Sequence, residues 1–181
     1  MVKATFITGN ASKAEYFHKY AGLEIDHHKL DQEEIQSLDL VEVVTHKAKQ
    51  AYAVLKRPVF VEDVSLEIAS LGRLPGTFIK FFIDELGLEK ICRLADITDD
   101  RSAIGRTAYA YCDEHGVKVF EGQIRGTIPE HPLGESGFGW DPIFIPEGYS
   151  VSRAQLSEQD YETVYLQIKP IKQLAEYIKS L

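Results

Sequence analysis

The chain has 181 residues, of which 44% are hydrophobic, with 28 acidic and 20 basic side chains and a net charge of −8. This length suits one domain with a substantial core, and the apolar content is too high for a disordered chain. The acidic balance argues against binding to nucleic-acid polymers or membrane surfaces, but it leaves room for a small anionic ligand in a locally basic pocket.

The predicted elements begin with a strand, a tight turn and a helix, and a strand hairpin follows in the middle of the chain. In order, we expect strand Val2–Thr8, helix Ser12–Ala21, strand Ile25–Leu30, helix Val41–Leu55, strand Pro58–Glu62, helices Phe78–Leu86 and Glu89–Ala95, strands Ser102–Asp113 and Lys118–Gly126 with a turn at Glu114–Gly116, a short strand Ile143–Ile145 and helix Pro170–Leu181. The second helix is expected to carry Val41, Val44, Ala48, Ala51 and Leu55 on one face. Alternating βα units and a hairpin indicate a mixed-sheet α/β fold.

The cysteines and the hydropathy indicate where the protein resides. Cys92 and Cys112 lie far apart, and no Cys/His spacing typical of a zinc site appears. We therefore expect free thiols, as in a reducing cytoplasm. No apolar run approaches the roughly 18 residues of a membrane span, and the N-terminal apolar stretch ends at Thr8-Gly9-Asn10, too early for a signal peptide. We expect a cytoplasmic protein.

A glycine-rich segment, Leu133–Pro142, carries Phe138 and Trp140, the only tryptophan. If this segment is extended, both rings lie on one face and form a platform for a flat heterocycle, worth about 1–3 kcal/mol per stacked base. Asp141 then points elsewhere, and Pro142 restricts its backbone. A turn that carries two core aromatic residues explains the segment equally well.

Three further groups of residues can carry chemistry. In Thr8-Gly9-Asn10-Ala-Ser-Lys13, a tight turn opens a helix whose N-terminus and lysine suit a phosphate, although a simple Asn cap with a surface lysine also fits. Glu62 and Asp63 end an apolar strand, where one carboxylate can bind Mg²⁺ or orient a water, with Glu34 as a second oxygen ligand. Solvated acids are the plain alternative. Lys47 and Lys80 matter only if they converge with Lys13.

Taken together, these motifs resemble the inosine triphosphate pyrophosphatase family, hydrolases of non-standard purine nucleotides. The resemblance spans nearly the whole chain and consists of seven modest motifs in the order of the family. They are Thr8-Gly9-Asn10 with Lys13, Glu34-Ile35-Gln36, Lys47-Ala48, Val61-Glu62-Asp63, Leu71–Gly76, Lys80 and Phe138–Pro142.

The resemblance implies a single domain over 1–181, with an elongated mixed β-sheet, flanking helices and two lobes around a central cleft, usually in a homodimer. It implies Mg²⁺-dependent cleavage of a nucleoside triphosphate (ITP, dITP or XTP) to monophosphate and pyrophosphate. Asp63 is implied as the water-activating base and a metal ligand, and Glu34 as the other metal ligand. The implied substrate contacts are Thr8, Asn10, Lys13, Lys47 and Lys80 for the phosphates, and Phe138, Trp140 and Asp141 for the base.

The implied chemistry agrees with the charges involved. A triphosphate carries a charge of about −4, so lysines and a dication are needed together. Attack at the α-phosphorus needs a positioned water and neutralised oxygens, with little covalent chemistry from the protein.

The sequence departs from the family in the part that reads the base. The family has a Lys and then Ser-His-Arg before its last helix, and here these positions are Tyr161 and Tyr165-Leu166-Gln167. Charge-assisted hydrogen bonds are worth about 1.5–3 kcal/mol each, so losing two or three can relax base discrimination by several powers of ten. A second departure follows Asp63, where Val64 replaces the usual hydroxyl residue and Ser65 comes next.

These departures leave other functions open. The first is a pyrophosphatase with altered base specificity, for which Gln167 and Tyr161 offer a different donor set. The second is a nucleotide-binding module without turnover. The third, a merely structural relative, is disfavoured by the retained Glu34, Asp63 and Lys13.

Overall fold

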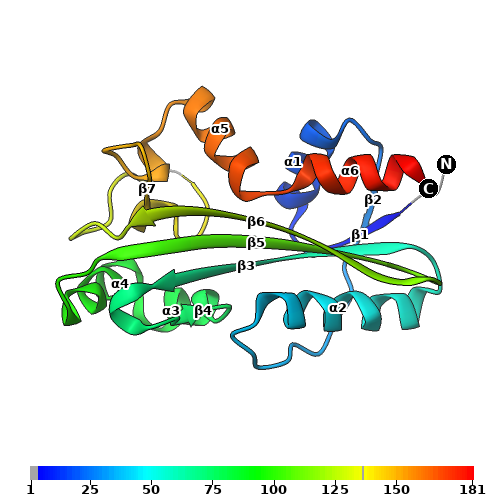
Figure 1. Ribbon diagram of the computed structural model, residues 1–181, viewed down its shortest axis with the longest axis horizontal. Helices are drawn as coiled ribbons and strands as arrows, with labels where there is room; N and C mark the ends of the chain where they lie inside the picture. The colour runs from blue at the N-terminus through cyan, green and yellow to red at the C-terminus, as the bar shows by residue number, and fades with distance from the viewer. Residues whose placement is uncertain (1–3, 136) are drawn as a thin grey trace. The chain divides into compact units, whose positions relative to one another are not determined.

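The computed structural model describes residues 4–135 and 137–181 (Figure 1). Positions 2 and 3 of the first predicted strand, and position 136 of the glycine-rich segment, lie outside the described residues. The helices are α1 Ala11–Ala21, α2 Leu40–Leu55, α3 Ile79–Leu86, α4 Leu88–Leu94, α5 Glu158–Ile168 and α6 Ile171–Ser180. The strands are β1 Thr5–Ile7, β2 Asp26–His28, β3 Val59–Ile68, β4 Pro75–Gly76, β5 Ser102–Asp113, β6 Gly116–Thr127 and β7 Ile145–Pro146. Short 3₁₀ turns η1 to η4 cover Ala69–Leu71, Ala95–Ile97, Asp141–Ile143 and Arg153–Gln155.

The strands of the described residues form a seven-stranded mixed sheet in the order β2-β1-β3-β5-β6-β7, with β4 paired to β3. β1 runs parallel to β2 and β3, as βα units require, whereas β4 and β7 are antiparallel to β3 and β6. The predicted mixed α/β fold with flanking helices is confirmed.

The contacts divide the described chain into two compact units. Unit 1 comprises the residues up to Asp63, Thr107–Glu121 and Lys169–Leu181, and unit 2 comprises Val64–Arg106 and Gly122–Ile168. The strands β3, β5 and β6 therefore each supply one part to each unit.

In unit 1, α2 covers one face of the sheet, and α1 and α6 cover the other (Figure 1). The buried face of α2 consists of Leu40, Val43, Val44, Ala48 and Ala51. Of the residues predicted to share one face, Val44, Ala48 and Ala51 are buried, Leu55 is partly buried against the same core, and Val41 is partly buried.

The opposite face of unit 1 is packed with aromatic rings. Phe6 and Phe60 stack with ring centroids 4.5 Å apart, and Phe17 meets Tyr109 edge to face at 5.7 Å. All four rings are buried, so the hydroxyl of Tyr109 needs a polar partner inside the protein.

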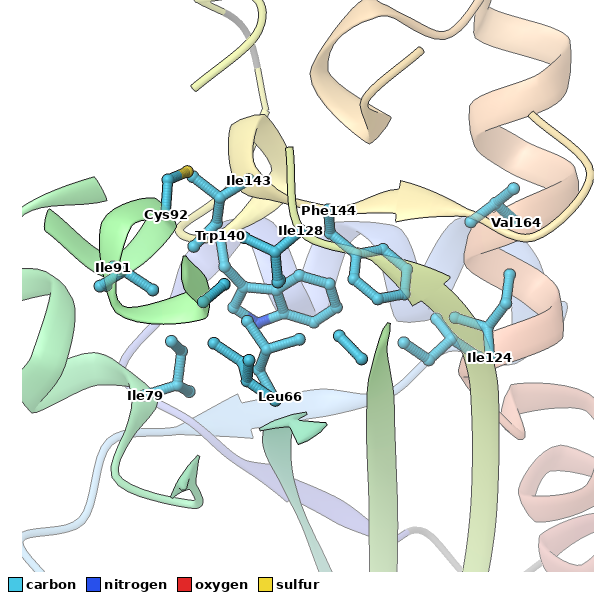
Figure 2. Packing of buried hydrophobic residues seen from close by; sticks show 14 residues of the cluster. Leu66, Ile79, Ile91, Cys92, Ile124, Ile128, Trp140, Ile143, Phe144 and Val164 are labelled. Atoms are coloured by element: carbon cyan, nitrogen blue, oxygen red, sulfur yellow. The ribbon is translucent and has the colours of Figure 1, made fainter. Parts of the chain in front are cut away.

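Unit 2 has its own apolar core around the indole of Trp140 (Figure 2). The residues that Figure 2 labels around it are Leu66, Ile79, Ile91, Cys92, Ile124, Ile128, Ile143, Phe144 and Val164. Gly105 lets the indole approach β5, because a Cβ atom there would lie 2.8 Å from the ring. Cys92 and Cys112 are free thiols, as predicted.

Several predicted elements differ from the structure. The strand predicted over Pro58–Glu62 continues as β3 to Ile68, and Ile143–Ile145 is the end of a 3₁₀ turn and the start of β7 rather than a strand. Helix α5 was not predicted. Pro170 caps α6 instead of lying within its first turn. Strand β5 has the predicted bounds, and no helix in the described part of the chain is long and apolar enough to span a bilayer.

We expect Gly126→Ala to destabilise unit 2. A Cβ atom at this position of β6 would collide with the carbonyl oxygen of Ile145 and lie 2.6 Å from the ring of Phe144, where β6 pairs with β7. Overpacking of this kind costs about 1–3 kcal/mol. Chemical denaturation measures the loss, with the exposed neighbour Arg125→Ala as the control; equal stability of the two variants would show that the contact relaxes.

Candidate active site

Two predicted site carboxylates converge on one nitrogen atom in unit 1. The Nζ atom of Lys47 lies 3.0 Å from Oε1 of Glu34 and 3.0 Å from Oδ2 of Asp63. The side chain of Lys47 is 14% exposed, that of Asp63 is 22% exposed, and that of Glu34 is 61% exposed. The group therefore opens to solvent on the side of Glu34.

Local structure places these three side chains. Helix α2 holds Lys47, and the carboxylate of Asp39 caps this helix by accepting hydrogen bonds from its first-turn N–H groups. The loop that carries Glu34 is tied to α2, because the side-chain amide of Gln32 donates to the carbonyl oxygen of Lys47 at 2.6 Å. Asp63 is held by the backbone of β3.

The donor set fits a hard divalent cation. Two carboxylate oxygens already share one positive charge, and oxygen ligands are those that Mg²⁺ takes. Within residues 4–135 and 137–181, no group of three or more His, Cys, Asp or Glu side chains has the arrangement of a metal site. Mg²⁺ is commonly held by one or two carboxylates together with substrate phosphates and waters, so two suffice here.

A second cluster in unit 1 surrounds Glu62, the residue before Asp63. The Oε1 atom of Glu62 accepts from two ammonium groups, with Lys13 Nζ at 3.0 Å and Lys169 Nζ at 2.7 Å. The hydroxyl of Tyr109 donates to Oε2 at 2.6 Å. The side chain of Glu62 is 1% exposed and that of Lys13 is 30% exposed, so Lys13 is the member of this cluster that reaches solvent.

The two clusters occupy opposite faces of β3. Successive side chains of a strand alternate, so Glu62 meets Lys13 of α1 on one face while Asp63 meets Lys47 of α2 on the other. Figure 1 shows α1 and α2 on these opposite faces of the sheet. Because neighbouring residues of a strand face opposite ways, at most one of these acids is expected to enter a site directly, unless the strand breaks there. The strand continues through both, and each acid has its own lysine partner.

The pKa values reflect this pairing. Burial alone would raise the pKa of Glu62, but the charges of Lys13 and Lys169 and the hydrogen bonds from Lys169 and Tyr109 outweigh it and lower the pKa from 4.5 to about 2. Burial lowers the pKa of Lys13, but Glu62 outweighs this effect and raises it. The charge of Asp63 raises the pKa of Lys13 further, so the two clusters act on each other.

Burial likewise lowers the pKa of Lys47, but Asp63 and then Glu34 outweigh this effect and raise it. A raised pKa keeps Lys47 positively charged at neutral pH.

Thr8 and Asn10 form the turn before α1. The Oδ1 atom of Asn10 accepts from the backbone N–H groups of Ser12 and Lys13 at 3.0 and 3.3 Å, and its own N–H donates to the hydroxyl of Thr8 at 3.1 Å. Asn10 is thus the helix cap that the plain reading expected, and its side-chain NH₂ is the part left to contact a phosphate.

The remaining predicted residues belong to unit 2. Lys80 is exposed in the first turn of α3. The segment around Phe138 and Trp140 is not extended, because Gly139 has a φ of 53° and the chain turns into η3 at Asp141. The two rings therefore part: Trp140 is 7% exposed and belongs to the core, whereas Phe138 is 45% exposed.

Asp141 organises this turn from a buried position. Its Oδ2 atom accepts from the backbone N–H of Phe138 at 2.8 Å and from the hydroxyl of Tyr161 at 3.0 Å. Its Oδ1 atom pairs with Nη1 of Arg153 at 3.0 Å. The guanidinium lies 5.1 Å from the ring of Trp140 and 5.2 Å from that of Tyr161, so one face of the indole is covered by the protein itself.

Three of these residues were not predicted from the sequence. They are Lys169 and Tyr109, which contact Glu62, and Arg153, which pairs with Asp141. Lys169 is a single lysine before a proline, and Tyr109 lies in a long strand, so neither carries a recognisable signal. Arg153 follows Ser152 in a capping box with Gln155, which predicts a turn but not an ion pair.

We expect Glu62 to make unfolding pH-dependent. Because its pKa in the folded protein lies below the unfolded value, it contributes stability that is fully present above about pH 5 and lost as the pH falls toward 2. This contribution is about 3 kcal/mol. Urea unfolding without divalent cations should show wild type and Glu62→Gln differing most above about pH 5 and converging near pH 2. A pH-independent difference would contradict the assignment.

The sequence is similar to those of known proteins. The sequence profile of the Ham1 family matches residues 4–177. An inosine triphosphate pyrophosphatase of Yarrowia lipolytica is 38% identical, with 98% of this chain and 96% of the relative aligned. A dITP/XTP pyrophosphatase of Methanopyrus kandleri is 36% identical, with 99% and 97% aligned.

The fold agrees with the sequence match. The structure of a HAM1 protein from Coxiella burnetii superimposes with a TM-score of 0.86 at 25% identity, covering 100% of both chains. The resemblance seen in the sequence motifs is confirmed: this chain belongs to the Ham1 family.

Proposed function

We propose that this protein is a Mg²⁺-dependent nucleoside triphosphate pyrophosphatase that converts ITP, dITP or XTP to the monophosphate and pyrophosphate. Its relatives of 36–38% identity bear the names inosine triphosphate pyrophosphatase and dITP/XTP pyrophosphatase. The observation that carries the proposal is the convergence of Glu34 and Asp63 on Lys47. Lys13 lies on the other face of β3, where it pairs with Glu62.

The residues of unit 1 suit the phosphate chemistry. Lys13 and Lys47 are ammonium groups that can pair with phosphate oxygens, and the turn of Thr8 and Asn10 adds neutral donors. Glu34 and Asp63 would hold the Mg²⁺ ion, which, when bound, withdraws charge from the phosphate oxygens. Asp63 accepts the proton of the attacking water, since its carboxylate is partly exposed.

The residues of unit 2 suit the base and part of the phosphate chain. Phe138 offers an exposed ring for stacking, and Asp141 fixes the turn that carries it. Lys80 adds one exposed cation. Trp140 supports this turn from the core, so its part in base binding is to position Phe138. The homodimer and the cytoplasmic location rest on the resemblance and the composition alone.

One observation favours a second candidate, a pyrophosphatase with altered base specificity. Tyr161 stands where the family has a lysine, and its hydroxyl binds Asp141, while the positive charge beside Asp141 comes from Arg153. An arginine presents a flat set of donors that suits two acceptors in one plane, unlike the point charge of a lysine. The donors around Asp141, namely the guanidinium of Arg153 and the hydroxyl of Tyr161, therefore differ in geometry from a lysine, which favours an altered base specificity.

The proposal is tested with a panel of inosine, xanthosine, adenosine and guanosine triphosphates, with Mg²⁺ and a pyrophosphate assay. We expect release from ITP or XTP and loss of about a hundredfold or more in Asp63→Asn, because the general base is gone. Asp26→Asn, at an exposed position of β2, is the control and should retain full activity. Full activity in Asp63→Asn would reject Asp63 as the base.

The same panel separates the candidates. Release from another base alone supports the altered specificity. Binding without release, unaffected by Asp63→Asn, would show a nucleotide-binding module instead. Circular dichroism of Asp63→Asn confirms that a loss of turnover is not a loss of fold.

We expect Phe138→Ala to weaken nucleotide binding by about 1–3 kcal/mol, because a stacking surface is removed. Isothermal titration calorimetry with ITP measures this loss. Phe81→Ala removes an equally large ring from another exposed position, 59% exposed on α3, and should leave the affinity unchanged. An unaltered affinity in Phe138→Ala would assign the base to a different surface.

A further inference from the structure

We propose that Lys169 is a positioning residue that neutralises Glu62 and thereby leaves the charge of Lys13 available to a polyphosphate. This inference rests on the proposed function, since it assigns Lys13 to the phosphates. It concerns a residue that forms an ion pair with Glu62 and acts through it.

The geometry shows a competition for one oxygen. Both ammonium groups bind Oε1 of Glu62, and Lys169 is the closer at 2.7 Å against 3.0 Å for Lys13. The side chain of Lys169 is 10% exposed, whereas that of Lys13 is 30% exposed. Lys169 is therefore the internal partner of Glu62, and Lys13 is the one that an anion from solvent can reach.

The cluster around Glu62 holds two ammonium groups and one carboxylate. Two ammonium groups against one carboxylate leave one positive charge in excess. Without Lys169, Glu62 and Lys13 would form a neutral pair, and a polyphosphate would have to break it. The new bond between Lys13 and the polyphosphate would then only replace the lost bond between Lys13 and Glu62, so it would add no affinity for the polyphosphate.

The fold places Lys169 for this role. It occupies the break between α5 and α6, where Pro170 caps α6. Helix α6 packs against α1, which carries Lys13, and Lys179 ties the two helices by donating to the carbonyl oxygen of Ala21 at 3.3 Å (Figure 1). Lys13 on α1 and Lys169 just before α6 are therefore presented to Glu62 from the same side of the sheet.

The test measures binding of inorganic tripolyphosphate by calorimetry, without divalent cations, so that neither the base nor turnover contributes. We expect Lys169→Met to bind roughly ten- to hundredfold more weakly than wild type, and Lys169→Arg to recover most of this loss. Lys172→Met, at an exposed position of α6, removes the same charge from the surface and should bind like wild type.

The double variant Glu62→Gln/Lys169→Met is decisive. It removes one charge of each sign, so the excess positive charge of the cluster is restored on Lys13, and tripolyphosphate binding should return toward the wild-type value. A double variant as weak as Lys169→Met would overturn the proposal and make Lys169 a direct phosphate contact. Wild-type affinity in Lys169→Met would overturn it as well. If Lys169→Met does not fold, the double variant is compared with Glu62→Gln. These two proteins differ only at Lys169, so equal tripolyphosphate affinities support a role through Glu62, and a weaker double variant makes Lys169 a direct phosphate contact.

Failure of the proposed function has a different signature. A protein that releases no pyrophosphate from any nucleotide but shows this order of tripolyphosphate affinities retains the role of Lys169. In an active protein, Lys169→Met should raise KM more than it lowers kcat, which a general loss of stability would not do.

Discussion

The alternation of side chains along β3 is the constraint on which unit 1 depends. Glu62 and Asp63 are adjacent, so they must face opposite sides of the sheet. On one side two ammonium groups meet one carboxylate, and on the other two carboxylates meet one ammonium group. One strand thus separates a surplus of positive charge, suited to phosphate, from a surplus of negative charge, suited to a cation. Because the backbone is shared, the two surfaces remain in register.

Unit 2 uses a buried carboxylate for a different purpose. Asp141 is 1% exposed, and both of its oxygens are engaged: one accepts hydrogen bonds from the backbone N–H of Phe138 and the hydroxyl of Tyr161, and the other forms an ion pair with Arg153. Removing either member of the Asp141–Arg153 pair would leave an uncompensated buried charge, which is strongly destabilising. The result is a turn fixed by its own polar contacts, with Phe138 outside and Trp140 inside. Gly137 belongs to the same arrangement, since a Cβ atom there would lie 2.7 Å from the carboxylate.

Periodicity predicted the elements whose burial is regular, and contacts between distant residues decided the rest. Strand β5 alternates in burial from Ser102 to Thr107 and is continuously buried from there to Cys112, and it was predicted with its observed bounds. Helix α5 has only Val164, Tyr165 and Ile168 buried, so its periodic signal is weak, although Ser157 and Asp160 form a capping pair that could have marked its start. The second lysine partner of Glu62, Lys169, comes from the far end of the chain, which no local pattern reveals.

The alternation along β3 also limits how this chain can change in length. One residue inserted between Val59 and Glu62 would turn every later side chain of the strand to the other face, exchanging the environments of the two acids. Apolar partners would be reversed at the same time, since Leu66 and Ile68 would leave their core. The turn at Glu114 and His115 bears no such restriction, because both residues are exposed. Length variation among homologous chains should accordingly be tolerated at that hairpin tip and be excluded from the strand that carries the two carboxylates.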